Sequence, residues 1–456
     1  MKKILNEQLI LFTSVLKWVL LATITGAIVG LSTVVFLKIL DLSTQFMGRY
    51  ELYFLILPFG LLISTLLVMY LAPDAEGHGT EKVIESVHKK FGDIKLSVVP
   101  VKLIATVVTI ASGGSVGKEG PCAQIGAGLA SSFAKLLKLN KQDRKKLVIC
   151  GISAGFSSVF GTPIAGAIFG VEVLYIGDIL YDVLLPSFIA GIVSYHVTSS
   201  LGITYFHHPI KFTPIFSESF FIKVILAGIF FGICARIFIE SMDLFEKLNK
   251  RINLWKPWKS LLGGSILVVL TFIFGKQYLG LGLDTIQNAI EGKNVVFYAF
   301  IAKIIFTSIT LNFGGSGGVV TPIFFVGATS GILFAKMLGL DFSTFSAIGF
   351  VSVLAGATNA PIAASIMSVE LFGPSLAPYA SVACIISFIM TGHKSIYPSQ
   401  VLSIAKSSSI EVEVGKEIEY VTPKLKTKGK GMVYWEFVIK KFKRGDNSSK
   451  SDDRDG

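Results

Sequence analysis

Charged residues are scarce in this chain of 456 residues: Asp, Glu, Lys and Arg make up 16% of it, whereas hydrophobic residues make up 52%. A soluble globular chain carries about a quarter charged residues. The shortage excludes an ordinary cytosolic enzyme, and the apolar excess excludes a disordered chain. The composition therefore predicts a multi-pass integral protein of the cell membrane, and we expect both termini in the cytoplasm.

Motifs for metal, nucleotide and redox chemistry are also missing. The sequence contains no HExxH, Walker A or GxSxG motif, and no G-x-G-x-x-G in a strand-helix setting. The cysteines stand singly in apolar stretches, which is typical of small buried side chains rather than of disulfides or metal ligands; they are Cys122, Cys150, Cys234 and Cys384. We therefore predict no metal site, no cofactor and no enzymatic activity, with a membrane-embedded enzyme as a remote alternative.

Long uncharged runs are abundant. Residues 18–37, 52–72 and 371–392 form runs of 20, 21 and 22 residues without a charge. About 20 apolar residues in helical form cross a bilayer core, and alternation of period two is absent, so the runs predict helical spans and not a β-barrel. The first run is too long for a cleaved signal sequence and is predicted to be a permanent span.

The formal net charge of +12 arises from 42 Lys and Arg against 30 Asp and Glu. We expect the surplus in loops and at helix ends, as in other polytopic membrane proteins, and predict no nucleic-acid partner. Residues 1–11 are predicted to be a cytoplasmic N-terminus. Residues 407–456 are predicted to be a partly disordered cytoplasmic tail, whose basic runs either contact anionic lipid headgroups or have no function.

The chain repeats itself. G-G-S-V-G-K-E-G-P at residues 113–121 and G-G-S-G-G-V-V-T-P at residues 314–322 share a pattern at an offset of 201, and P-I-A-G-A-I-F-G-V-E at 163–172 matches P-I-A-A-S-I-M-S-V-E at 361–370 at an offset of 198. We divide the membrane region into half-repeats at 12–210 and 211–406. Duplicated halves with Gly- and Pro-broken segments are typical of transport proteins. A packing duplication without a pore is the alternative, but lipid would not tolerate the exposed backbone of such broken segments.

Glu119 is the leading candidate for a functional residue. It follows Lys118 and precedes Gly120 and Pro121 at a predicted helix start, where unpaired backbone N–H groups and the helix dipole attract anions. An ionised carboxylate there occupies the anion site itself, whereas a protonated one leaves it free, so the residue can act as gate and proton acceptor. A simple helix-capping acid is the alternative.

The second-half copy keeps the helix start without the acid. We expect the backbone N–H groups of Val319 and Val320 to face those of Gly117, Lys118 and Gly120 across one dehydrated anion. Partial charges bind an ion without trapping it, which permits conduction.

Other ionisable residues lie in apolar surroundings. Glu172 and Glu370 end the two P-I-A motifs, and because both copies carry the acid we predict a structural role rather than a direct role in transport. Tyr397 precedes Pro398 at a predicted helix start, so its hydroxyl either faces the site or belongs to an interfacial belt. Taken alone, His78 is a loop histidine.

These motifs resemble those of the CLC family of chloride channels and chloride/proton exchangers over about residues 12–406. G-K-E-G-P is highly specific, and G-V-V-T-P and Y-P-S-Q are similar to two further family segments. The resemblance implies an all-α fold of two inverted helical halves, a homodimer with one pore per subunit, and chloride held between helix N-termini. It also implies that Glu119 is the external gating acid, that Tyr397 supplies a central hydroxyl, and that Val319 and Val320 supply facing N–H donors.

The sequence departs from the family pattern at three positions. His78 stands where the family usually has a serine that binds chloride, so the resemblance implies that His78 lies at the anion site. Val320 stands where the family often has Phe, and Val173 where exchangers carry an internal proton-transfer glutamate. The family's cytoplasmic CBS domains are missing. Apolar residues at the position of Val173 favour a chloride-selective channel gated by Glu119. A chloride/proton antiporter that uses Glu119 as its external proton carrier is the close alternative, and a cation-coupled solute carrier is a third.

Overall fold

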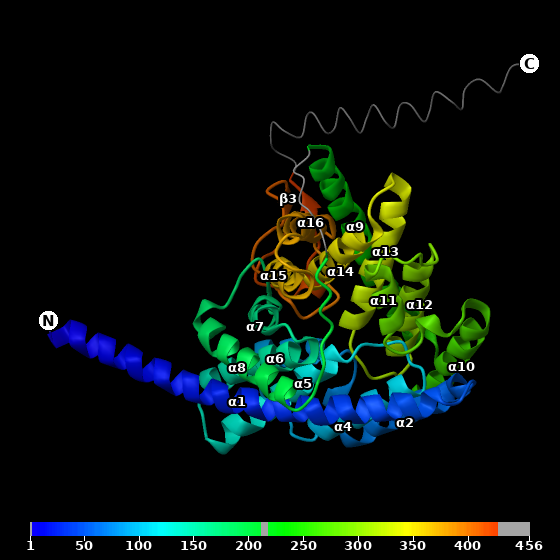
Figure 1. Ribbon diagram of the computed structural model, residues 1–456. Coiled ribbons are helices and arrows are strands. Elements are labelled where there is room, and N and C mark those ends of the chain that lie inside the picture. Colours follow the sequence, from blue (N-terminus) through cyan, green and yellow to red (C-terminus); the bar gives the residue numbers. More distant parts are fainter. Residues whose placement is uncertain (1, 211–217, 427–456) are drawn as a thin grey trace, which may run out of the picture.

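The computed structural model describes residues 2–210 and 218–426. The chain is a bundle of helices (Figure 1), and the order of the helices along the chain repeats once. The helices of the first half are α1 (Lys2–Gly48), α2 (Leu57–Leu71), α3 (Thr80–Lys89), α4 (Val98–Ala111), α5 (Glu119–Leu136), α6 (Lys141–Phe160), α7 (Pro163–Glu172) and α8 (Tyr181–Ser200).

The second half follows the same order. Its helices are α9 (Glu218–Arg251), α10 (Lys256–Phe274), α11 (Leu283–Ile290), α12 (Ala299–Asn312), α13 (Val320–Leu338), α14 (Phe342–Thr358), α15 (Pro361–Phe372) and α16 (Ala377–Met390). Helices α5 and α13 begin at residues 119 and 320, which reproduces the offset of 201 seen in the sequence motifs. The predicted division after residue 210 lies at the edge of residues 211–217, which are outside the described residues.

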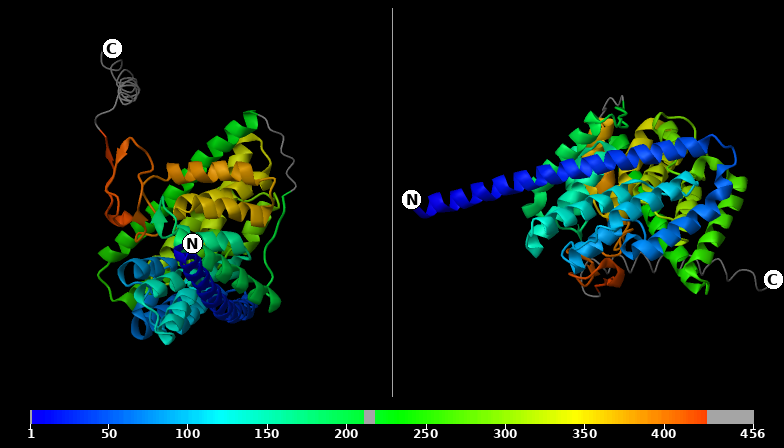
Figure 2. Two further views of the ribbon diagram at one scale, coloured as in Figure 1. Left: turned by 90° about the vertical axis from the view of Figure 1, so that its left-hand side faces the viewer. Right: turned by 90° about the horizontal axis from the view of Figure 1, so that it is seen from below.

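Six helical segments within the described residues are long and apolar enough to cross a membrane. They are Asn6–Gly48, Tyr53–Leu71, Tyr181–Ser200, Glu218–Arg251, Lys256–Phe274 and Val320–Leu338. Helix α1 continues without a break across the predicted boundary at residue 12, and its N-terminal end extends beyond the rest of the bundle (Figure 2). The predicted N-terminal segment is therefore helical within the described residues.

The third predicted span is wrong as a single helix. Residues 371–392 are divided at Gly373, whose φ of 93° ends α15, and α16 begins only at Ala377. Gly373 and Pro374 interrupt the helix because glycine adopts this backbone conformation freely and proline cannot donate the helical hydrogen bond.

Glycines bring matching helices of the two halves into backbone contact. A Cβ at Gly126 of α5 would lie 2.4 Å from the carbonyl oxygen of Gly151 in α6, and a Cβ at Gly327 of α13 would lie 2.3 Å from that of Gly349 in α14. Small residues at such crossings permit the close packing that membrane helices require. The glycine enrichment thus builds the same tight helix pair in each half.

The described segment after α16 contains short strands and one 3-10 helix, η4 (Ile418–Tyr420), but no α-helix. β2 (Val401–Leu402) pairs in parallel with β1 (Tyr175–Ile176), and β3 (Ile410–Glu411) pairs antiparallel with β4 (Lys424–Leu425). The predicted helix start at Pro398 is therefore wrong: the chain turns there, with the Gln400 amide donating to the Tyr397 carbonyl at 3.1 Å. Most of the predicted disordered tail, residues 427–456, lies outside the described residues.

Candidate anion site

Two glycine-rich loops from opposite halves meet at the centre of the bundle. The amide of Gly117 donates to the Gly318 carbonyl at 2.7 Å, and the amide of Gly318 donates to the Gly117 carbonyl at 2.6 Å. Each residue of this antiparallel bridge precedes the first residue of its helix, α5 or α13, by two positions. The N-termini of these two helices therefore meet at one place, where their unpaired N–H groups and dipoles favour negative charge.

Glu119 belongs to the N-terminus of α5, but its carboxylate is bound at the N-terminus of α13. One carboxylate oxygen, Oε2, accepts a hydrogen bond from the Thr321 amide at 3.1 Å, and the other, Oε1, accepts one from the Thr321 hydroxyl at 2.5 Å. Glu119 is 1% exposed to solvent. A carboxylate thus occupies the position between the two helix starts at which a free anion would be favoured.

At the start of α13 the carboxylate is bound by Thr321, one position after the predicted donor Val320, and the predicted Gly117 amide is already bonded to the Gly318 carbonyl. Lys118 is the residue before α5, and Val319 is the residue before α13. Val319 and Val320 are almost fully buried, so their backbone groups line the interior and not the lipid surface. Hydrogen bonds within helices begin only in the second turn, so the first N–H groups of α13 are available to a ligand.

The loop that carries His78 packs directly on the start of α5. A Cβ at Gly120 would lie 2.1 Å from the His78 carbonyl oxygen, and a Cβ at Gly79 would lie 2.4 Å from the Gly120 carbonyl oxygen. Gly79 also has a φ of 78°, which side chains with a Cβ rarely adopt. Both glycines are therefore required to bring His78 beside the helix start that carries Glu119.

Tyr397, from the second half, lies beside the His78 loop. Its side chain is fully buried, and its ring centroid lies 6.4 Å from that of His78. The Tyr397 hydroxyl lies near Glu119 and Thr80. The hydroxyls of Thr80 and Tyr397 and the Nδ1 atom of His78 are buried without a hydrogen-bond partner among the described residues. Buried groups of this kind normally have partners, so these three point to a ligand or water between them.

A buried lysine holds the His78 loop from behind. Lys102 of α4 donates from Nζ to the carbonyl oxygens of Gly77 at 2.6 Å and Ala75 at 3.1 Å. The corresponding lysine of the second half, Lys303, donates to the carbonyls of Tyr278 at 3.1 Å and Gly280 at 2.9 Å. Both lysines are fully buried, so each half fixes the loop before its third helix in the same way.

The acids that end the P-I-A motifs bind helix N-termini of the opposite half. Glu172 accepts hydrogen bonds from the amides of Ile362 at 3.0 Å and Ala363 at 2.8 Å, at the start of α15. Glu370 accepts them from Ile164 at 2.9 Å and Ala165 at 2.8 Å, at the start of α7. The acids therefore satisfy orphan amides and complement helix dipoles, and neither lies on the Glu119 carboxylate.

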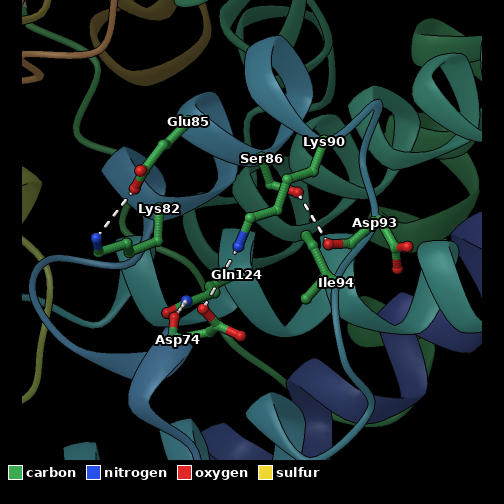
Figure 3. Close-up of a pocket in the computed structure, with 8 residues that line it drawn as sticks. All are labelled: Asp74, Lys82, Glu85, Ser86, Lys90, Asp93, Ile94 and Gln124. Carbon is green, nitrogen blue, oxygen red and sulfur yellow. Dashed lines mark hydrogen bonds and ion pairs between the residues drawn. The ribbon is translucent and has the colours of Figure 1, made fainter.

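A polar surface pocket lies beside α3 and is distinct from the Glu119 site (Figure 3). Within it Lys82 forms an ion pair with Glu85 at 3.0 Å, and the Gln124 side chain donates to the Asp74 carbonyl at 2.9 Å. The pocket is lined by Asp74, Lys82, Glu85, Ser86, Lys90, Asp93, Ile94 and Gln124. Its mixed charges give it no preference for an anion.

Sequence reasoning missed three residues of this region. Thr321 stands inside the G-V-V-T-P motif but received no role, although the first N–H groups of a helix commonly bind anions. Glu81 follows G-H-G-T directly, and Lys102 is a single charge within an apolar helix, which is itself a signal of function in a membrane protein. The roles of these three residues become visible only from the groups that they contact in the structure.

Known proteins show the same architecture. Residues 59–392 match the family model described as voltage gated chloride channel. The chain is 36% identical over 403 residues to a chloride/fluoride channel protein of Pseudomonas syringae pv. tomato, covering 86% of this chain and 88% of that protein. It is 27% identical over 303 residues to the voltage-gated ClC-type chloride channel ClcB of Shigella flexneri, covering 64% and 72% of the two chains.

Solved structures agree with this relationship. The crystal structure of a CLC-type fluoride/proton antiporter superposes with a TM-score of 0.81 at 28% identity and covers 85% of this chain and 98% of that one. The structure of a slow cyanobacterial chloride/proton antiporter, at 18% identity and a TM-score of 0.73, shares the fold over 83% and 96% of the two chains. This multi-pass integral membrane protein therefore belongs to the CLC family of anion channels and transporters, which are not enzymes.

Proposed function

We propose that this CLC protein exchanges fluoride for protons and that Glu119 carries the proton at the outer side of the anion path. One observation carries the proposal: the Glu119 carboxylate accepts hydrogen bonds from the start of α13, where α5 also begins. A side chain with a titratable anionic end occupies the position of an anion. Anion binding and protonation of Glu119 are then coupled, because each requires the carboxylate to leave or lose its charge.

The cycle follows from charge. The ionised carboxylate satisfies the amides at the helix start and blocks the path. Protonation removes its negative charge, so its hydrogen bonds to Thr321 weaken and an anion can replace it on the same donors. The Thr321 amide and hydroxyl, together with the amides of Lys118, Gly120, Val319 and Val320, then supply partial positive charge without a full cation, and the ion can leave again.

The groups around His78 favour a small, strongly hydrated anion. Fluoride loses a tightly held water shell on entering a dehydrated path, so it needs strong hydrogen-bond donors in return. The Thr80 and Tyr397 hydroxyls, and the His78 Nδ1 atom in the tautomer that carries its proton there, are buried without other partners. The relatives support this assignment: one is named a chloride/fluoride channel protein and another a fluoride/proton antiporter.

The second candidate is the chloride-selective channel gated by protonation of Glu119. The buried apolar side chain of Val173 favours it, because no carboxyl at that position receives a proton. In that case chloride moves down its gradient without proton exchange. We further propose a homodimer in the cell membrane with both termini in the cytoplasm, which cross-linking and protease accessibility would test.

Liposomes that contain the purified protein distinguish these functions. Fluoride efflux, chloride efflux and internal pH are recorded together with an ion electrode and a trapped pH dye. The proposal expects fluoride efflux to exceed chloride efflux and to drive proton uptake against a proton gradient, and it expects Glu119→Gln to abolish proton uptake and pH dependence while fluoride still passes. Efflux without proton movement would establish the channel, and faster chloride than fluoride efflux would reject the fluoride assignment.

A further inference from the structure

Buried polar side-chain atoms without partners concentrate at one place. Eleven such atoms occur in the described residues, and four of them belong to His78, Thr80, Glu81 and Tyr397. The first three residues are consecutive or nearly so around the start of α3. Three of the four groups can donate a hydrogen bond to an anion. The fourth, a carboxylate oxygen of Glu81, repels an anion when ionised and therefore needs another explanation.

Glu81 is bound on one side and free on the other. Its Oε1 atom accepts a hydrogen bond from the Ser399 amide at 3.0 Å and another from the Ser399 hydroxyl. Its Oε2 atom is buried and has no partner. Glu172 and Glu370, in contrast, each bind two amides with two oxygens. Among the described residues, Oε2 of Glu81 is the one buried carboxylate oxygen left unpaired, and a bound proton would occupy it.

Glu81 and Glu119 share Tyr397 as a buried neighbour. The Tyr397 hydroxyl is near both carboxylates. Glu85 stands four positions after Glu81, on the same face of α3, and its side chain is 32% exposed in the polar pocket of Figure 3. A titratable group near Tyr397 is therefore followed, one helical turn on, by a titratable group that meets water.

The immediate surroundings allow Glu81 to exist as a neutral acid. Helix α3 is not among the helices long and apolar enough to span the membrane. Burial raises the pKa of the Glu81 carboxyl, whereas the hydrogen bonds from Ser399 and the charge of Lys82 lower it and the charge of Glu85 raises it. Desolvation is the largest of these effects, so the group holds a proton more readily than an exposed glutamate does.

We propose that Glu81 is the inner proton carrier, which takes up the proton that Glu119 releases and passes it to solution through the pocket beside Glu85. This rests on the proposed proton exchange. When the O–H bond of Glu119 breaks, its carboxylate is regenerated and returns to Thr321; the proton moves along the hydroxyls of Tyr397 and Thr80 and water, and forms an O–H bond at Oε2 of Glu81. Loss of this proton to the pocket restores the Glu81 carboxylate.

The competing role is structural, because Glu81 also fixes the turn at Ser399. Three variants separate the two roles. Glu81→Gln retains an acceptor for Ser399 but cannot exchange a proton, Glu81→Asp retains the acid, and Ser399→Ala removes one bond to Glu81 while leaving the carboxyl. The control is Glu76→Gln, which changes an exposed acid paired with Lys256 at 3.0 Å.

Fluoride efflux and proton uptake are measured in liposomes that contain each variant. We expect Glu81→Gln to pass fluoride while proton uptake falls to the level of protein-free liposomes, and we expect Glu81→Asp, Ser399→Ala and Glu76→Gln to retain proton uptake. Normal proton uptake by Glu81→Gln would overturn the assignment, as would loss of both fluxes in Glu81→Gln and Ser399→Ala alike. If the wild-type protein takes up no protons, the proposed exchange itself has failed, and the role of Glu81 fails with it.

Discussion

Thr321 binds both oxygens of the Glu119 carboxylate, one through its amide at 3.1 Å and the other through its hydroxyl at 2.5 Å. The two residues come from equivalent helix starts in opposite halves, so the contact joins the halves at the centre of the bundle. The same helix start that would hold an anion holds the gate. Closing the path and binding an anion are therefore alternative uses of one set of donors.

Thr321→Val tests the hydroxyl of this pair. A hydrogen bond to a charged group is worth about 1.5–3 kcal/mol, so its loss weakens the closed arrangement by roughly ten- to a hundredfold. We expect faster fluoride efflux at neutral pH and a weaker response to pH. Thr321→Ser keeps the hydroxyl and serves as the matched variant. Equal efflux from the two variants would show that the hydroxyl does not hold the gate.

His78→Ser tests the selection of the anion. The substitution replaces the ring with a small hydroxyl beside Tyr397. The site becomes wider, and a small ion is bound less strongly. We expect the ratio of fluoride to chloride efflux to fall by about tenfold, the equivalent of one hydrogen bond of ordinary strength. A ratio that stays at the wild-type value, measured with ion electrodes on the same liposomes, would assign selectivity to other residues.

Lys102→Met tests whether the lysine clamp serves the site. Without Lys102 the carbonyls of Gly77 and Ala75 lose their donor, and the His78 loop loses its support. Lys303→Met removes the equivalent clamp, which holds the loop at Tyr278 and Gly280 and not the His78 loop.

We expect both lysine variants to melt at lower temperature in detergent, because each leaves two buried carbonyls unpaired. Only Lys102→Met is expected to weaken fluoride binding. Equal binding by the two variants would show that the clamp at Lys102 is purely structural.

Glu172→Gln tests the reciprocal helix caps. One amide nitrogen then faces the backbone N–H groups at Ile362 and Ala363 in place of an acceptor, and the charge that complements the dipole of α15 is lost. We expect destabilisation of about 1–3 kcal/mol, seen as a lower melting temperature. Glu370→Gln should have a smaller effect because Glu370 is more exposed. The reverse order would contradict this explanation.

The duplicated motifs predicted much of the architecture, because the repeat at an offset of 201 recurs in the starts of α5 and α13. Hydropathy alone failed where the chain breaks inside an apolar run. At Gly373 the helix ends, although the run of uncharged, mostly apolar residues continues. Composition reports how well residues tolerate lipid, whereas a break depends on backbone conformation and on neighbours that satisfy the freed groups.

The site was predictable as a set of loops but not as a set of contacts. The helix-start patterns indicated Glu119 and its neighbours, because N-terminal signals are local. The partners of Glu119 and Glu81 are Thr321 and Ser399, which lie 202 and 318 positions away along the chain. Long-range pairs of this kind depend on how the two halves pack, which a single sequence does not specify.

Fluoride binding to the purified protein tests the central claim most directly. Isothermal titration at neutral pH, where an ionised Glu119 competes for the helix starts, is compared between the wild-type protein and Glu119→Gln, with Glu76→Gln as the control. If the carboxylate occupies the anion position, Glu119→Gln binds fluoride at least about tenfold more tightly than the wild-type protein does. The reason is that a neutral amide gives up its hydrogen bonds more readily than a charged carboxylate. Equal affinities in all three proteins would contradict the account.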